Sequence, residues 1–192
     1  MTVEWHDVLP STMDLAHARA AEGAPHGTAI AARVQTAGRG RRGRTWHSPA
    51  GGLWMSVVCR PSDLGGVEHL SLRVGLAVAE TIERLFPDLP RLTVKWPNDL
   101  LLGGRKLAGI LCEARWEGGT PAWVIAAVGL NVINSIPDEV ASQATRLGEY
   151  LPGLVPERLA EPLAAAIAEA ADRPGSLTAE ESRQLVLREP GR

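Results

Sequence analysis

Cysteine is scarce in this sequence, which has only two, Cys59 and Cys112, among 192 residues. Each lies within an apolar stretch, so we expect a small buried side chain rather than half of a disulfide. The five histidines are scattered singly, and no two of them have the short spacing that metal ligands use. The sequence therefore predicts neither a disulfide nor a structural zinc site.

Long apolar runs are also missing. No segment reaches the about 20 apolar residues that a membrane-spanning helix needs. The start of the chain, Met1–Asp7, carries charge where a secretory signal would need an apolar run. We expect a cytoplasmic protein with no membrane partner.

A large excess of charge of either sign is absent, because the formal net charge is −2 at pH 7 and 45% of the residues are hydrophobic. This is the composition of an ordinary soluble globular protein, and it argues against a basic surface for nucleic acid. No internal repeat or long linker is visible. Since 192 residues suffice for a sizeable core, we expect residues 1–192 to form a single domain.

One basic stretch stands out against this background, Gly38–Arg44 (GRGRRGR), which we call the arginine loop and which Thr45 and Trp46 follow. Glycine lets the backbone approach a ligand closely, and each guanidinium offers a planar fork of donors to carboxylate or phosphate. The pattern predicts an anion-binding loop, with a flexible segment that binds nucleic acid as the alternative. Because it has four arginines and no apolar side chain, we expect an open chain until bound anions order it as a lid.

Three further stretches extend the pattern: Lys95–Leu100 (KWPNDL), Arg105–Leu111 (RKLAGIL) and Gly129–Val132 (GLNV). Together with the arginine loop, in this order and spacing, they resemble the biotin protein ligases over residues 3–150. That family has a fold related to class II aminoacyl-tRNA synthetases and shares it with lipoate ligases and octanoyl transferases. The resemblance implies an α+β fold, with helices packed on a mixed, largely antiparallel β-sheet.

The elements expected from apolar patterning and breakers fit such a fold. The expected strands are residues 3–9, 28–35, 53–60, 92–96, 100–102, 106–115 and 122–132. The expected helices are residues 12–21, 70–86 and 156–171, the last interrupted by Pro162, and a short final helix opened by the capping box Thr178–Glu181. Turns are expected at the glycine pairs 65–66, 103–104 and 118–119. Neighbouring strands would then bring Lys95, Asn98, Lys106 and Asn131 over one sheet face, although a solvated edge position is the usual alternative for a lysine.

The resemblance implies roles for the residues that match the family's motifs. Lys106 would contact both the biotin carboxylate and the α-phosphate of ATP, and Arg39 and Arg41 would close over them, so these three are the catalytic candidates. The candidates for biotin binding are Ser11, Thr12, Gln35, Gly38, Arg39, Arg41, Lys106 and Gly109. The candidates for nucleotide binding are Arg41, Arg44, Trp46, Asn98, Lys106 and Asn131, with Trp46 stacked against adenine.

The chain departs from the family pattern at Met13, which stands where a Ser-Thr-Asn triplet would have its asparagine. This substitution removes an amide from the place where the ureido ring of biotin would bind. From the residues alone, Ser11 or Thr12 is a helix cap, and the resemblance adds a role in ligand binding. One hydroxyl can cap while the other binds.

The implied reaction uses ATP and Mg²⁺ with biotin as substrate, and its acceptor is the biotin carboxyl carrier protein domain of a biotin-dependent carboxylase. A carboxylate needs activation as an acyl-adenylate because its oxygen is a poor leaving group. Asp99 is a candidate Mg²⁺ ligand, with an Asn-Asp turn as the alternative. No nucleic-acid partner is expected, and the choice between a monomer and a homodimer is left open.

Two parts of larger family members are not expected. Too few residues precede Ser11 for an N-terminal helix-turn-helix, and the segment after Gly175 is too short and too helical for a C-terminal SH3-like domain. The leading interpretation is a biotin protein ligase without a DNA-binding domain. The alternatives are a lipoate or octanoate ligase, a non-catalytic biotin-binding relic and, from the arginine loop alone, a nucleic-acid binder.

Overall fold

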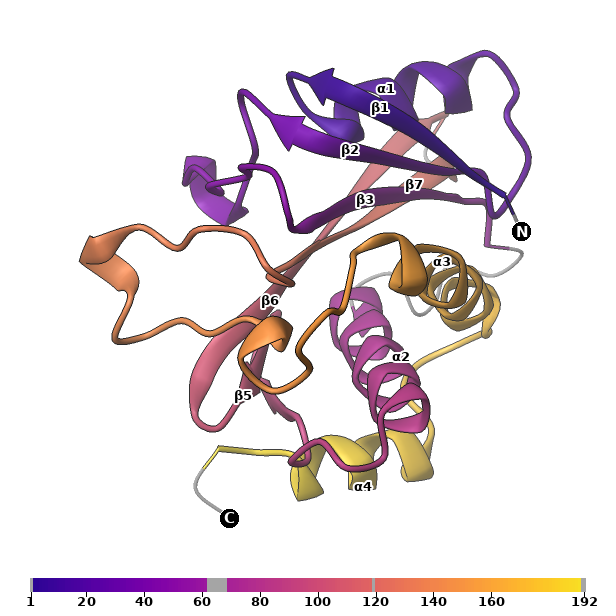
Figure 1. Cartoon of the computed structure of the whole chain (residues 1–192). Coiled ribbons are helices and arrows are strands. Elements are labelled where there is room, and N and C mark those ends of the chain that lie inside the picture. Colours follow the sequence, from indigo (N-terminus) through magenta and orange to yellow (C-terminus); the bar gives the residue numbers. More distant parts are fainter. Residues whose placement is uncertain (1, 62–68, 119, 191–192) are drawn as a thin grey trace.

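The computed structural model describes residues 2–61, 69–118 and 120–190. Within them a seven-stranded sheet runs in the order β1-β2-β3-β7-β6-β5-β4. Its strands are β1 (Val3–Leu9), β2 (Ala29–Gln35), β3 (Leu53–Cys59), β4 (Thr93–Lys95), β5 (Asp99–Leu102), β6 (Arg105–Glu117) and β7 (Thr120–Leu130). β1 and β2 are parallel, and all other neighbouring strands are antiparallel. The expected α+β fold is confirmed (Figure 1).

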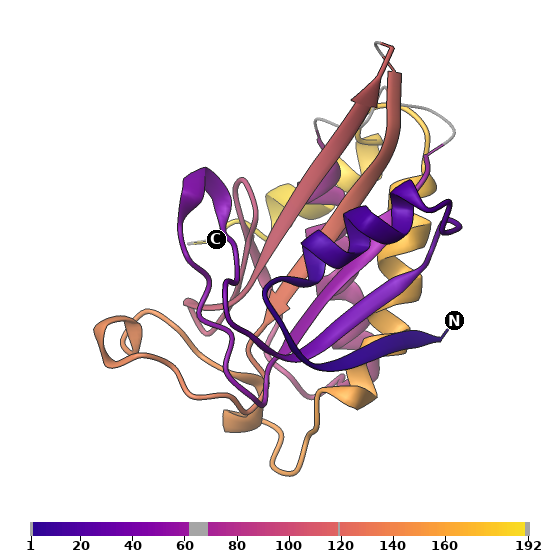
Figure 2. The ribbon, with the colours of Figure 1, turned by 90° about the horizontal axis from the view of Figure 1, so that it is seen from above.

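Helices cover both faces of this sheet. α1 (Thr12–Ala21) lies on one face, across β2, β3 and β7, as Figure 2 shows from above. α2 (Leu70–Leu85) and α3 (Glu157–Asp172) lie side by side on the other face (Figure 1). α1 is short, so it leaves the rest of its face of the sheet to the loops described below.

The strands separate two cores because successive side chains point to opposite faces. On β3, Met55 and Val57 join the larger core against α2 and α3. Val58 joins the smaller core under α1, together with Met13. Every residue of β3 is buried, as is typical of a central strand covered on both faces.

Pro162 does not interrupt α3, so that expectation was wrong. The helix runs from Glu157 to Asp172 with Pro162 in its second turn. A proline inside a helix costs about 3 kcal/mol, because it removes one hydrogen bond and crowds the preceding turn. Leu159, Leu163 and Ile167 are fully buried on the same helix, and each such side chain contributes about 1.5 to 3 kcal/mol. Packing therefore outweighs the local cost.

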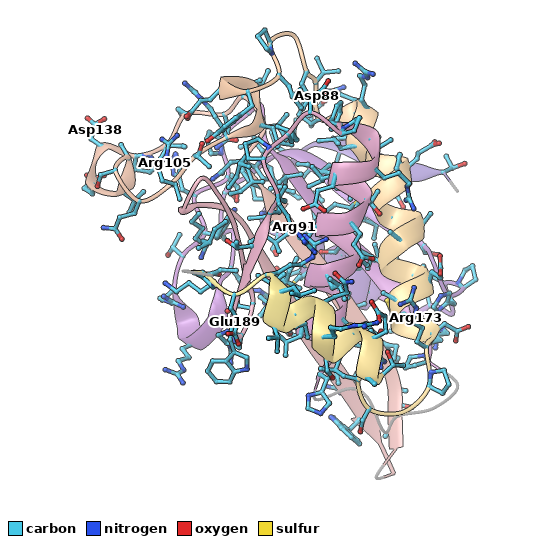
Figure 3. All side chains as sticks on the ribbon, turned by 90° about the horizontal axis from the view of Figure 1, so that it is seen from below. Asp88, Arg91, Arg105, Asp138, Arg173 and Glu189 are labelled. Atoms are coloured by element: carbon cyan, nitrogen blue, oxygen red, sulfur yellow. The ribbon has the colours of Figure 1, made fainter. Side chains whose placement is uncertain are left out.

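The last helix, α4 (Ala179–Leu187), begins with the expected capping box, in which Thr178 and Glu181 satisfy each other's backbone N–H groups. Glu181 also lies 3.0 Å from Arg73 of α2, and both side chains are almost fully buried. Arg173 adds a second guanidinium 3.3 Å from Glu181 and lies where the end of α3 meets α4 (Figure 3). A buried charge cluster thus fixes the start of α4.

The end of α4 is fixed in a similar way. Arg188 lies 2.7 Å from Glu83 of α2. The backbone carbonyl of Arg188 accepts a hydrogen bond from Val94 N at 2.8 Å. α4 therefore joins α2 to β4, the strand that leads into the Lys95–Leu100 stretch.

Both cysteines are free thiols, Cys59 buried and Cys112 half-buried. Burial raises the pKa of each thiol to about 12, so both are chemically inert at neutral pH. The turn expected at Gly103 and Gly104 is confirmed by φ angles of 58° and 77°. The pair Gly65-Gly66 lies outside the described residues, as does Gly119.

Candidate active site

A cavity of about 780 Å³ lies on the α1 face of the sheet, beside the start of α1 and over β3, β7 and β6. Two segments roof it, the arginine loop and the residues 131–145 that follow β7, and both project from the same side of the molecule (Figure 2). The predicted residues that line it are Ser11, Thr12, Gln35, Arg39, Arg41, Arg44, Trp46, Asn98, Asp99, Lys106, Gly109 and Asn131. The structure thus brings together every predicted site residue except Gly38, in a volume typical of small-molecule sites.

Gly38 lies beside the cavity, inside the framework of the arginine loop. A Cβ at this position would stand 2.4 Å from the carbonyl oxygen of Trp46 and 2.5 Å from Ser48 Oγ. No side chain fits there, because the two arms of the loop approach each other too closely. This gives Gly38 a structural reason to be glycine, and its contact with biotin stays a prediction.

The arginine loop is a narrow hairpin rather than the open chain expected from its composition. Trp46 N donates to Gly38 O at 2.9 Å, and Gly40 N donates to Arg44 O at 2.7 Å. The tip is a single 3₁₀ turn, Arg41–Gly43, in which Arg42 adopts a left-handed φ of 58°. Charge repulsion does not open the loop, because the cross-chain hydrogen bonds hold the backbone while the side chains of Arg42 and Arg44 are exposed to solvent.

A cluster of uncharged polar groups forms the α1 end of the cavity. Gln35 Oε1 accepts hydrogen bonds from Thr12 N at 2.8 Å and Thr12 Oγ1 at 3.2 Å, and Gln35 Nε2 donates to Ser48 Oγ at 2.9 Å. Thr12 Oγ1 also lies 2.8 Å from Ser56 Oγ. Ser11 caps α1 by accepting from Met13 N at 3.3 Å. The cap expected at Ser11 is confirmed, while Thr12 is held in the polar cluster.

Trp46 lies over two glycines that face each other across β6 and β7, Gly109 and Gly129. A Cβ on Gly129 would stand 2.6 Å from the indole Nε1, and one on Gly109 would stand 3.0 Å from the indole Cζ3. The indole meets Trp54 edge-on, with ring centroids 6.5 Å apart. Its Nε1 is buried and has no hydrogen-bond partner within the described chain. Two glycines therefore make a flat trough that accepts an aromatic ring.

Lys106 stands near the start of β6 and is one of the residues that line the cavity. Its Nζ lies 2.8 Å from Asp99 Oδ1, an ion pair rather than a well-aligned hydrogen bond, and 5.0 Å from the centre of the Trp46 ring. Its backbone is held by the roof, because Lys106 N donates to Gln143 O at 2.7 Å and Thr145 N donates to Lys106 O at 2.9 Å. The lysine is thus fixed at both its backbone and its ammonium.

The two predicted asparagines are already engaged in the free protein. Asn98 donates to Ile110 O at 2.9 Å and accepts from Arg41 NH1 at 3.4 Å, so it connects the arginine loop to the sheet. Asn131 donates to Thr145 O and accepts from Asn134, both at 3.1 Å. A nucleotide contact by Asn131 stays a prediction, since its amide now fastens the 131–145 segment.

The charge of the cavity is strongly positive. Its lining includes five cationic side chains, from Arg39, Arg41, Arg44, Lys95 and Lys106. Among the described residues that line it, Asp99 is the one carboxylate. Because the whole chain is slightly acidic, this local excess of cations favours an anionic ligand.

A charged contact outside the cavity holds the base of the 131–145 segment. Arg105 NH2 lies 2.7 Å from Glu149 Oε2. Burial alone would raise the pKa of Glu149, but hydrogen bonds from Arg105 and Thr145 lower this pKa below its ordinary value. Figure 3 shows Arg105 near the sheet and Asp138 at the outermost tip of the segment. The segment is therefore anchored at its base and projects freely at its tip.

Sequence reasoning missed several residues of the site. Ser56 had a readable signal, because it is the single polar residue in the apolar strand β3 and shares the face of Trp54. Gly129 had one too, since it opens the Gly129–Val132 stretch that the sequence analysis singled out without giving this glycine a role. Ser48 and the backbone of Gln143 had none, because loop residues have no periodic pattern.

Within residues 2–61, 69–118 and 120–190, no group of three or more histidine, cysteine or acidic side chains is arranged to hold a metal ion. Over the same residues, no helix combines the length and the apolar character needed to cross a membrane.

Comparison with known proteins agrees with this geometry. Residues 5–131 match the model of the "Biotin/lipoate A/B protein ligase family". The chain is 43% identical over 150 residues to the bifunctional ligase/repressor BirA of Bacillus subtilis, covering 76% of this chain and 46% of that protein. It is 44% identical over 135 residues to the biotin--[acetyl-CoA-carboxylase] ligase of Mycobacterium tuberculosis, covering 68% of this chain and 48% of that protein.

Among solved structures, the biotin protein ligase of Aquifex aeolicus in complex with biotin and ATP superposes with a TM-score of 0.75 and 30% identity, over 88% of this chain and 70% of that one. The chain spans about half the length of the two curated relatives. The matched residues 5–131 include most of the residues that line the cavity, and the chain belongs to the biotin/lipoate A/B protein ligase family.

Proposed function

We propose that the protein activates biotin with ATP to biotinyl-5′-AMP, releases pyrophosphate, and transfers biotin to a lysine of a biotin carboxyl carrier protein domain. One observation carries this proposal: a single cavity joins a neutral polar cluster at Thr12 and Gln35 to a group of five cations that includes Lys106. The first suits an uncharged polar ring, and the second suits a carboxylate beside a triphosphate. The names of the relatives support the same reaction.

The first step needs cations more than it needs a base. Attack of a carboxylate on the α-phosphate brings two anions together, and fixed positive groups offset the charge that develops. Lys106 would contact both the carboxylate and the α-phosphate, because its ammonium lies 5.0 Å from the centre of the Trp46 ring in the cavity that the arginine loop also lines. Arg41 would reach the phosphates from its place beside Asn98. Pyrophosphate then leaves, and the mixed anhydride stays in the cavity.

The polar end of the cavity would hold the ureido ring. Thr12 and Gln35 are held by each other, so their remaining hydrogen-bonding capacity is directed by the fold rather than by free rotation. Met13 is buried in the core under α1 and offers no amide. Ser11 and the backbone of the arginine loop would supply the remaining polar contacts.

Trp46 and Arg44 would serve the nucleotide, with Asn98 and Asn131 at its edge. The trough of Gly109 and Gly129 sets the position of the indole, and an aromatic ring of this kind can stack on adenine. The indole of Trp46 would then form one wall of the site in which the biotin carboxylate attacks the α-phosphate of ATP. In the second step a neutral acceptor lysine attacks the carbonyl carbon of the anhydride and forms an amide, while the acyl–phosphate bond breaks and AMP leaves with a proton lost from the amine.

Mg²⁺ would neutralise the phosphates when bound. The lining offers the metal one carboxylate, because Asp99 is the one acidic side chain among the described lining residues. Asp99 is already paired with Lys106. Mg²⁺ commonly keeps several waters and is bound through one or two carboxylates and the phosphates of the substrate. Asp99 would therefore be a single protein contact to a metal carried mostly by the nucleotide.

The remaining assignments belong to the same proposal. Residues 1–192 would act as one catalytic domain, in the cytoplasm, on the carrier domain of a biotin-dependent carboxylase. Assembly as a homodimer would be tested by analytical ultracentrifugation with and without biotin, and a single monomeric species under both conditions would exclude it.

A second candidate is a lipoate or octanoate ligase. Met13 favours it, because an apolar side chain stands where biotin ligases have an amide, and the family model includes lipoate ligases. Lipoate would use the same cations for adenylation but would make little use of the polar cluster at Thr12 and Gln35.

The test supplies the purified protein with Mg-ATP and either biotin, lipoate or octanoate, and measures pyrophosphate. We expect release with biotin, and then biotin transfer to an added carrier domain. Release with lipoate and none with biotin would replace the proposal by the second candidate. Biotin binding without pyrophosphate release would identify a non-catalytic relic.

A further inference from the structure

Arg39, the first arginine of the arginine loop, is paired with two carboxylates from different elements. Its NH1 lies 2.9 Å from Asp14 Oδ1, in the first turn of α1, and its NH2 lies 3.7 Å from Glu113 Oε2, on β6. One guanidinium therefore joins the loop to a helix and to the sheet.

Glu113 is itself held in place from the other side. His17 Nε2 lies 3.4 Å from Glu113 Oε2, and His17 Nδ1 accepts a hydrogen bond from Trp123 Nε1 at 3.0 Å. Because Nδ1 is the acceptor, the ring proton of a neutral His17 is assigned to Nε2, which faces Glu113. The carboxylate that meets Arg39 is thus oriented by a chain of contacts from α1 and β7.

The backbone of Arg39 is part of the hairpin of the loop, because it bridges to Thr45. The next residue continues the same framework, with Gly40 N bonded to Arg44 O at 2.7 Å. Arg41, which follows Gly40, donates to Asn98 Oδ1 at 3.4 Å. Fixing Arg39 therefore fixes the arm of the loop that carries Arg41.

We propose that Asp14 and Glu113 are positioning residues of the reaction, which fasten the arginine loop over the cavity by holding Arg39. Neither carboxylate is among the residues that line the cavity, so each acts through the loop. Pairing also neutralises one of four neighbouring arginines, which reduces their repulsion. The inference rests on the proposed function for its kinetic consequences, but the fastening itself belongs to the free protein.

The effect of removing the pairs is expected to be graded rather than complete. The side chains of Arg39, Asp14 and Glu113 are 41%, 55% and 40% exposed. Exposed ion pairs are individually weak and are screened by salt. For the double variant Asp14→Asn/Glu113→Gln we expect KM for biotin and ATP to rise roughly 5- to 30-fold, with a smaller change in kcat.

The first test is limited trypsin digestion of the free double variant, which requires no activity. Trypsin should cut within residues 39–44 several times faster than in the wild-type protein, and raised salt should bring the wild-type rate toward that of the variant. The matched control is Glu22→Gln, which neutralises the carboxylate at the C-cap of the same helix, at the end opposite to Asp14. Glu22 is paired with Arg19 at 3.3 Å. Equal cutting rates in the double variant and the wild type would overturn the proposal.

The second test distinguishes fastening from direct contact of Arg39 with a ligand. If Arg39 acts through its carboxylates, pyrophosphate release should fall to a similar extent in Arg39→Ala, in the double variant, and in the triple variant that combines all three substitutions. A far greater loss in Arg39→Ala than in the double variant would overturn the positioning role and make Arg39 a ligand contact. Asp14→Glu, which keeps the charge, should restore most of the loss caused by Asp14→Asn. Failure of the wild-type protein to release pyrophosphate with biotin would refute the proposed function while the trypsin result still decides the fastening.

Discussion

The trough under Trp46 gives a sharp test of the site, through the substitution Gly129→Ala. The added methyl would stand 2.6 Å from the indole Nε1 and 2.7 Å from Cε2. Carbon atoms in ordinary contact are about 3.5 to 4.0 Å apart, so the indole must move by about 1 Å. Trp46 belongs to a loop and will shift more readily than the sheet. The substitution therefore displaces the ring and leaves the fold intact.

The size of the effect follows from the contacts that the ring loses. Its edge-on contact with Trp54 is worth about 0.5 to 1.5 kcal/mol, and its contact with the Lys106 ammonium about 0.5 to 1 kcal/mol. Misplaced stacking on the nucleotide would add to this loss. We expect kcat/KM for biotin-dependent pyrophosphate release to fall roughly 5- to 150-fold. This fall corresponds to a loss of about 1 to 3 kcal/mol in the free energy that stabilises the transition state.

The matched control is Gly75→Ala, the same chemical change on the other face of the sheet. A Cβ at Gly75 would stand 3.8 Å from its nearest neighbour, Leu100 Cδ2, so it fits without displacement. Because Gly75 lies inside α2, the alanine should stabilise the fold by about 0.5 to 1 kcal/mol and leave kinetics unchanged. Thermal unfolding and pyrophosphate release measured on both variants separate stability from activity.

A double-mutant cycle with Trp46→Ala identifies the cause. If the clash with the indole is responsible, Gly129→Ala should have little further effect in a protein that already lacks the ring. Wild-type kinetics in Gly129→Ala would refute the argument that the position of Trp46 matters to the reaction. Losses that simply add in the double variant would show that the methyl acts on something other than Trp46.

Three other predictions follow from the same structure. Lys106→Ala should slow adenylate formation by about 10²- to 10³-fold with an unchanged circular-dichroism spectrum, and a normal rate would remove its catalytic role. Glu181→Gln should destabilise the fold at pH 7 by about 3 kcal/mol in urea titrations, because it leaves the buried Arg73 without its counter-ion. Burial alone would raise the pKa of Glu181, but hydrogen bonds from the backbone of Thr178 and from Arg73 hold this pKa below its ordinary value, so its stabilisation is complete above pH 4.5 and lost as pH falls through the folded pKa. The difference between wild type and variant should therefore shrink in acid, and a constant difference would contradict the assignment. Trypsin should cut the free protein first within residues 39–44, biotin should slow this cut and Mg-ATP should slow it further, whereas one rate under all conditions would mean that the arginine loop is not a lid.

The fold was largely predictable because its signals are local. β3 is a run of buried apolar residues, and α2 has apolar residues at helical spacing, so each shows its element without its neighbours. Pro162 misled the prediction, because the rule for proline describes an isolated helix and the burial of α3 is a tertiary effect. Whether a proline is tolerated inside a helix depends on how the helix packs against the rest of the fold, and that packing cannot be read from one sequence.

The site was predictable in composition but not in geometry. The motifs identified Lys106 and the arginine loop as parts of one cavity. They did not show that Arg39 is held by Asp14 and Glu113, because that contact joins three elements that lie far apart in the sequence. They also failed to show the hairpin of the loop, since its stability comes from backbone hydrogen bonds that any sequence with the right glycines could make.

The bond from Val94 N to Arg188 O has a consequence for the solution behaviour of the protein. β4 is the last strand of the sheet, and in an antiparallel pair alternate residues direct their N–H groups away from the neighbouring strand. Val94 is such a residue, and the main chain after α4 covers its outward N–H. An uncovered edge can pair with another chain and start aggregation. A truncation that removes α4 would therefore uncover this edge next to the exposed indole of Trp96, and the protein would be expected to precipitate before it lost its cavity.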